Sequence, residues 1–210
     1  MYAFENCNSL ISISFPSCTS IGSNAFYSCF KLTNIDFPNC NFIGLNAFYN
    51  CSKLTSIDFP NCTTIGGYAF YKCTSLTSIN FSSCITISIR AFGGTVDTPP
   101  SLTTAIWGDP IVIADFPNCI TISDYAFQGC SKLTTANFPN CTTIGSAAFQ
   151  YCYSLTSINF SNCITINGLA FGGYNSTTNS TTTLYQGCKI VSAIFPKCTT
   201  IGTSAFYRCN

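Results

Sequence analysis

One unit of 22 residues is repeated along almost the whole chain. An Ala-Phe pair marks it, and its phenylalanine recurs every 22 residues, except at two intervals that are 13 residues longer: Phe4, Phe26, Phe48, Phe70, Phe92, Phe127, Phe149, Phe171 and Phe206. A unit this short cannot bury an apolar side by itself, so neighbouring units must stack and share a core. The repeat therefore predicts a solenoid.

Each unit changes from a strand pattern to a helix pattern. In the unit 51–72, Ile57 and Phe59 alternate with polar residues, as in a strand with one buried side, and Pro60 ends this run. Ile65 and Phe70 then belong to a set with helical spacing. We expect an α/β solenoid with parallel strands on one face and short α or 3-10 segments on the other.

The sixteen cysteines follow the repeat. The first eight lie eleven residues apart, which is half a unit: Cys7, Cys18, Cys29, Cys40, Cys51, Cys62, Cys73 and Cys84. This regularity favours a ladder of thiols that fills the core, because free cysteine behaves as a small hydrophobic residue. Redox or metal chemistry is the alternative, but the chain has no histidine and no Cys-x-x-Cys pair.

Composition excludes several classes of function. Only 7% of the residues are charged and the net charge is +1, so nothing predicts binding to nucleic acid. No apolar run approaches the ~20 residues of a membrane span, which predicts no membrane insertion. Without histidine there is no His-based triad or general base. We expect a protein that is not an enzyme and has no catalytic, cofactor or metal site.

Two insertions interrupt the repeat, at about 93–110 and 172–187, and both are rich in Gly, Ser, Thr or Pro. They occupy the same place in a unit, and residues 62–94 match residues 141–173 at 24 of 33 positions. The chain is thus expected to be one solenoid domain over 1–210, part of a longer chain or assembly, with two loops in register.

The pattern LxxIxFPxCxxIGxxAFxxC resembles the leucine-rich repeat, and specifically its bacterial surface-antigen (BspA-like) class. The resemblance implies a right-handed superhelix of parallel strands. It also implies an adhesion or recognition role at an extracellular or cell-surface location, although the sequence begins without the features of a signal peptide. Two departures are the period of 22 and the cysteine where Leu or Val is commoner.

The outward strand positions and the insertions hold the candidate ligand-binding residues. On a regular sheet, rows of hydroxyl, amide and carboxylate groups can bind a protein or a glycan, or can serve only as a soluble surface. Trp107 suits a binding hot spot or a plug against the solenoid. The candidates are Asn34, Asp36, Ser56, Asp58, Ser78 and Asn80 on the strands and Trp107, Asp109, Tyr174 and Tyr185 in the insertions.

Asp36 and Asp58 occupy equivalent positions in adjacent units, at a spacing of about 4.8 Å. This pair predicts a weak cation site, a pair of carboxyls with a raised pKa, or an ordinary solvated face.

A structural role is the main alternative to recognition. The sequence begins and ends in mid-unit, with no polar capping repeat, so end-to-end self-association through the solenoid ends is the second hypothesis.

Overall fold

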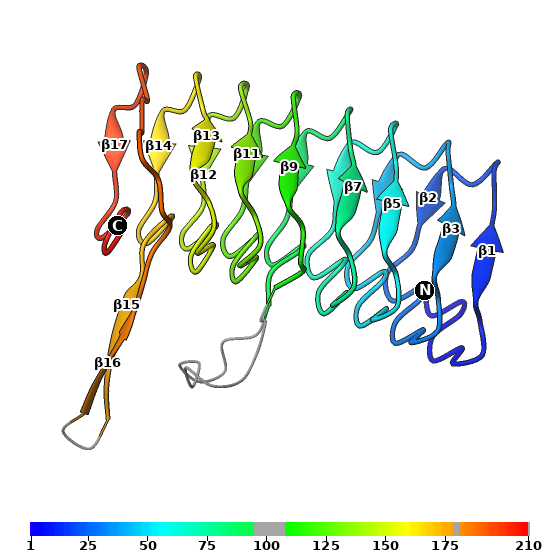
Figure 1. Ribbon diagram of the computed structural model, residues 1–210. Coiled ribbons are helices and arrows are strands. Elements are labelled where there is room, and N and C mark those ends of the chain that lie inside the picture. The colour runs from blue at the N-terminus through cyan, green and yellow to red at the C-terminus, as the bar shows by residue number, and fades with distance from the viewer. Residues whose placement is uncertain (95–107, 179–180, 210) are drawn as a thin grey trace.

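The structure is a computed structural model that describes residues 1–94, 108–178 and 181–209. The chain forms a solenoid whose coils stack side by side into an elongated body, and a hairpin projects from one edge (Figure 1). Stacking of equivalent residues from coil to coil confirms the solenoid that the repeat predicted.

The coils contribute strands to two columns, and the last coil contributes a strand to the second column only. The first column holds strands of three residues: β1 (Ser12–Ser14), β3 (Asn34–Asp36), β5 (Ser56–Asp58), β7 (Ser78–Asn80), β9 (Ile113–Asp115), β11 (Thr135–Asn137) and β13 (Ser157–Asn159). They pair in parallel as β1-β3, β5-β7 and β9-β11-β13. The middle residue of each strand points inward, as Ile57 does at 4% exposure.

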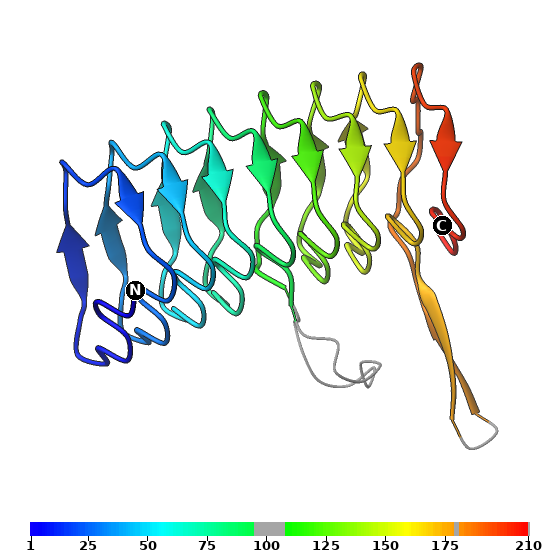
Figure 2. The same cartoon turned by 180° about the vertical axis from the view of Figure 1, so that it is seen from behind.

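The second column is an uninterrupted parallel sheet of eight strands, which faces the viewer in Figure 2. Its strands have two residues each: β2 (Ser20–Ile21), β4 (Phe42–Ile43), β6 (Thr64–Ile65), β8 (Thr86–Ile87), β10 (Thr121–Ile122), β12 (Thr143–Ile144), β14 (Thr165–Ile166) and β17 (Thr200–Ile201). Every pair in it joins equivalent residues, for example Ile43 with Ile65. The sequence pattern predicted strands on one face only, so this second strand column was not expected.

Consecutive turns close each coil, and the predicted α or 3-10 segments are wrong: no helix forms in the described ranges. The N–H groups of Ala25 and Tyr27 donate to carbonyls three residues earlier, whereas those of Asn24 and Phe26 donate to the next coil. Asn24 also has φ 56°, in the left-handed region. A helix needs every N–H for its own ladder. Bonding every second N–H to the neighbouring coil therefore prevents one.

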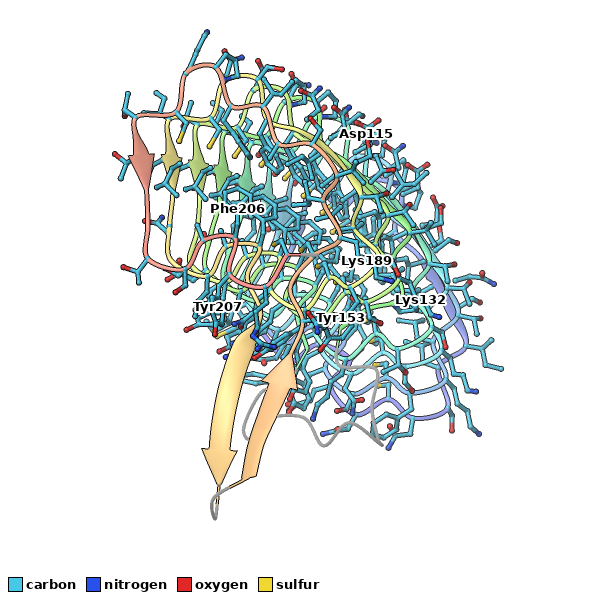
Figure 3. All side chains as sticks on the ribbon, turned by 60° about the vertical axis from the view of Figure 1, so that its left-hand side comes forward. Asp115, Lys132, Tyr153, Lys189, Phe206 and Tyr207 are labelled. Atoms are coloured by element: carbon cyan, nitrogen blue, oxygen red, sulfur yellow. The ribbon has the colours of Figure 1, made fainter. Side chains whose placement is uncertain are left out.

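Two columns of phenylalanine rings form the core. Rings of one column stack from coil to coil, as Phe127 does on Phe149 at 5.2 Å between centroids. Rings of the other column meet them edge-on, as Phe138 meets Phe149 at 5.9 Å. Figure 3 views the stack from its C-terminal end, where Phe206 points into the interior. Twelve phenylalanines are fully buried, so the core runs unbroken along the axis.

The second insertion forms an antiparallel hairpin of β15 (Tyr174–Thr178) and β16 (Thr181–Tyr185). It leaves the solenoid after Gly172, where the ideal Cβ of a larger residue would lie 2.6 Å from the Ser204 carbonyl oxygen. The hairpin extends away from the coils (Figures 1 and 2). Of the first insertion, only residues before 95 and after 107 are described.

Candidate binding surface

The outward side of the first strand column carries rows of exposed polar side chains. Asn34, Ser56 and Ser78 are exposed and occupy equivalent positions in β3, β5 and β7. Beside them the Thr33 and Thr77 hydroxyls donate to main-chain carbonyls of the preceding coil, at 3.1 and 3.3 Å. The predicted strand candidates therefore lie on one surface, which we call the strand face.

A row of carboxylates and amides runs beside these hydroxyls. The Ser14 hydroxyl donates to Asp36 at 2.6 Å, and the Asn80 amide donates to Asp58 at 2.7 Å. The row continues with the Asn137 amide, which donates to Asp115 at 2.7 Å. Each carboxylate thus accepts a hydrogen bond from a neighbouring coil. This arrangement fits the solvated face among the two alternatives, and the described residues contain no group of three or more metal-ligating side chains.

Asp36 and Asp58 coincide with an interruption in the strand column. β3 and β5 are neighbours but belong to separate hydrogen-bonded sheets. Like charges at directly opposite positions of adjacent strands destabilise their pairing. A second interruption separates β7 from β9, where Asn80 and Asp115 stand at this position, so like charge alone does not account for the interruptions of the column.

The insertion candidates are not brought together with the strand face. Trp107 lies outside the described residues. Tyr174 and Tyr185 pair in register at the base of the hairpin. Asp109 is fully buried, which places it in the core and away from any ligand-binding surface.

Asp109 replaces a cysteine in one of two columns of thiols. The column comprises Cys7, Cys29, Cys51, Cys73, Asp109, Cys130, Cys152, Cys188 and Cys209. Within the described residues neither carboxylate oxygen has a hydrogen-bond partner. Burial raises the pKa of Asp109 well above its usual range, because the core disfavours the charged form of the carboxyl.

The thiols of both columns are free, and all except that of Cys7 donate hydrogen bonds to main-chain carbonyls. Cys51 donates to Phe26 of the preceding coil at 3.2 Å, and Cys62 donates to Thr64 of its own coil at 3.3 Å. Cysteine thus combines a small apolar volume with a weak donor. Cysteine therefore suits these core positions, because an aliphatic side chain would fill the space but would not donate a hydrogen bond to the main-chain carbonyl.

Native thiols are expected to resist alkylation. Burial raises the pKa of Cys62, Cys84 and Cys141 to about 12, so the reactive thiolate is scarce at neutral pH. In the native protein, a maleimide at pH 7 should rapidly label only the four half-buried cysteines, which are Cys7, Cys18, Cys198 and Cys209. After unfolding in urea it should label all sixteen. Mass spectrometry of the labelled protein measures this. Rapid native labelling of Cys62 would contradict the buried columns.

A groove at the corner between the two strand columns was missed by the sequence analysis. Its volume is about 680 Å³. Its lining includes the amides of Asn118, Asn140 and Asn162 and exposed isoleucines such as Ile120. Each amide donates to a carbonyl of the preceding coil, as Asn140 does to Pro117 at 2.8 Å. The recurrent Pro-Asn-Cys or Ser-Asn-Cys motif was the signal that would have indicated this row.

A family model described as BspA type leucine rich repeat region (6 copies) matches residues 1–98 and 110–210. The search of curated proteins gave no match. No helix in the described part of the chain is long and apolar enough to cross a membrane.

Three solved structures are similar to the chain. A leucine-rich repeat protein from Eubacterium ventriosum ATCC 27560 is 20% identical with a TM-score of 0.53, over 94% of this chain and 42% of that one. A leucine rich repeat protein from T. pallidum is 22% identical with a TM-score of 0.49, over 75% and 60%. A leucine rich cell surface protein from Faecalibacterium prausnitzii A2-165 is 24% identical with a TM-score of 0.45, over 99% and 66%. The chain spans less than two thirds of each.

Proposed function

Because this chain belongs to the BspA-type leucine-rich repeat family, we propose that it is a non-enzymatic recognition module that binds a protein or glycan ligand through its strand face. We also assign ligand contacts to the two insertions, apart from the strand face. A location at the cell surface goes with the proposal, because the sequence resembles the surface-antigen class.

The regular order of the polar groups on the strand face supports this role. Exposed residues such as Ser56 and Ser78 recur at the coil spacing, and Asp58 and Asn80 hold each other by a hydrogen bond of 2.7 Å. Groups that are already fixed lose little conformational entropy when a ligand binds. Because only 7% of the residues are charged, hydrogen bonds from neutral polar groups would supply most of the recognition on the strand face.

A glycan and protein array with the labelled native protein tests the proposal. Ser56→Lys combined with Ser78→Lys should weaken a detected interaction at least about tenfold, a loss of about 1.4 kcal/mol. The matched control is Thr64→Lys with Thr86→Lys on the eight-stranded sheet, which should leave affinity within about twofold. Equal effects of the two double variants, or no binding to any array component, would contradict the proposal.

A structural role would require the chains to associate end to end through the ends of their solenoids. This self-association stays a prediction. Light scattering over a range of concentrations measures it. A protein that stays monomeric at high concentration would exclude this role.

A further inference from the structure

The coils that follow the two insertions are each one residue short. From Cys152 to Cys163 the chain advances eleven residues, as in the regular coils. From Asp109 to Cys119, and from Cys188 to Cys198, it advances ten. Residues 191–198 align with 156–163 of the preceding coil without a gap, so the missing residue lies between Cys188 and Val191, before the outward strand segment. The segment that should complete the first strand column therefore has less chain with which to reach it.

The coil that contains Cys188 consequently meets its predecessor on two sides only. The N–H of Thr199 donates to Ile164 at 2.9 Å, and the N–H of Phe171 donates to Ala205 at 2.8 Å. On the third side, no main-chain hydrogen bond among the described residues joins β13 to residues 190–196. In Figure 1 the chain between β16 and β17 accordingly carries no strand arrow. One edge of β13 is open.

A cleft of about 440 Å³ occupies this place, a volume within the range of ligand pockets. β13 and its flanking residues form one wall, and Val191, Ser192, Ile194 and Pro196 form the other. Val191 is 89% exposed and Ile194 77% exposed. Their counterparts in the preceding coil are the polar residues Thr156 and Asn159. The open side thus combines a strand edge with aliphatic side chains.

The open edge of β13 presents main-chain groups in the order that a strand requires. In the preceding coil, the N–H of Phe138 donates to Asn159 at 2.8 Å and the carbonyl of Thr134 accepts from Thr156 at 3.1 Å. By the repeat, the N–H of Phe160 and the carbonyl of Thr156 are the corresponding groups of β13. Neither has a main-chain partner in the following coil, as far as the structure describes that coil.

We infer that this cleft binds an extended peptide, which adds to β13 as a further strand. This inference rests on the recognition role proposed above and narrows its ligand to a polypeptide. Addition of a strand satisfies alternating N–H and carbonyl groups with main-chain hydrogen bonds, while side-chain pockets select the sequence. A glycan offers hydroxyl groups but not this alternation of main-chain groups.

The side chains around the cleft specify the peptide. An aliphatic residue in its centre packs against Val191 and Ile194. Lys189 precedes the wall segment and Lys197 follows it, and both are exposed. The described residues that line the cleft include no acidic side chain. The matching ligand therefore has an aliphatic centre and acidic residues on both sides.

Restoring the missing residue should close the cleft. We would insert one serine between Lys189 and Ile190, and as the matched control one serine between Pro110 and Ile111. The probe is a fluorescein-labelled peptide of alternating valine and threonine with two aspartates at each end. In fluorescence anisotropy, the wild type and the control insertion should bind it, and the insertion after Lys189 should weaken binding at least about tenfold.

Hydrogen exchange gives an independent measurement of the edge. The amides of Ile158 and Phe160 should exchange rapidly in the free protein, slowly with the peptide bound, and slowly in the insertion variant without peptide. Should the insertion prevent folding, Val191→Asp with Ile194→Asp replaces it, because both side chains are exposed and their loss removes only the aliphatic wall. This double variant should also lose the acid-flanked peptide.

The inference fails if the peptide binds the insertion variant within about twofold of the wild type. It also fails if a probe with proline at alternate positions, which lacks those N–H groups, binds equally well. Failure of the proposed function is seen separately. In that case the array detects no ligand, or Ser56→Lys with Ser78→Lys has no effect, whatever the peptide titration shows.

Discussion

Phe149→Ala is expected to lower the free energy of unfolding by about 3–5 kcal/mol, the usual cost of removing a fully buried phenylalanine ring. The ring has no exposed surface and stacks on Phe127 and Phe171 at 5.2 and 5.3 Å between centroids. It also meets Phe138 and Phe160 edge-on at 5.9 and 5.8 Å. The substitution therefore leaves a cavity against four rings in the middle of the stack.

Urea unfolding followed by circular dichroism measures this loss. Phe42→Ala is the matched control, because the Phe42 side chain is 43% exposed on the outside of the second strand column and should cost about 1 kcal/mol or less. Equal losses for the two variants would show that the phenylalanine columns do not determine stability. A loss of ellipticity confined to a part of the transition would show instead that coils unfold in separate groups.

Asp109→Cys should raise the free energy of unfolding by about 2–3 kcal/mol at neutral pH, the cost of leaving a buried polar group without partners. The substitution completes the thiol column between Cys73 and Cys130. Its counterpart after the second insertion is Cys188, whose thiol donates to Phe149 at 3.2 Å. The fold thus already accommodates a cysteine at the corresponding place.

The pH dependence gives a second test. Burial raises the pKa of Asp109, so the folded chain keeps a proton that the unfolded chain releases above about pH 4. The contribution of this group therefore makes the free energy of unfolding fall as pH rises from about 4 toward the folded-state pKa. Asp109→Cys should remove that slope. A variant with an unchanged profile between pH 4.5 and 7.5 would contradict a buried carboxyl, and Cys188→Asp should produce the opposite changes.

The period of the sequence sufficed to predict the solenoid, the inward residues and the thiol columns, because stacking forces equivalent residues into rows. The turn side was mispredicted for a specific reason. Phe70 and its neighbours have helical spacing, but the hydrogen bonds of Tyr68 and Phe70 go to the next coil. A pattern of apolar residues records which side chains face inward. It does not record the partner of each N–H, which depends on the neighbouring coil.

The sequence also predicted the positions of some candidate binding residues correctly and of others wrongly. Ser56, Asp58, Ser78 and Asn80 lie on one face, as alternation along a strand predicted. Asp109 is in the core because its place is set by the thiol column, and an isolated charged residue in a loop-like stretch gives no sign of this. The cleft beside β13 lies in a coil that is one residue shorter than the regular coils. The spacing of ten residues before Cys198 was visible, but its effect on strand pairing depends on how far the chain can reach.

The alternation of hydrogen bonds in the turns also determines the electrostatic character of the whole stack. In the turn column the N–H groups point toward the C-terminal end, as from Asn24 to Leu45, so their peptide dipoles add along the axis. Along the eight-stranded sheet, groups such as the N–H of Gly44 point the other way, to Ile21. The two rows oppose each other. A long stack of aligned peptide groups can therefore avoid a large axial dipole, and it needs few charged side chains at its ends to compensate for one.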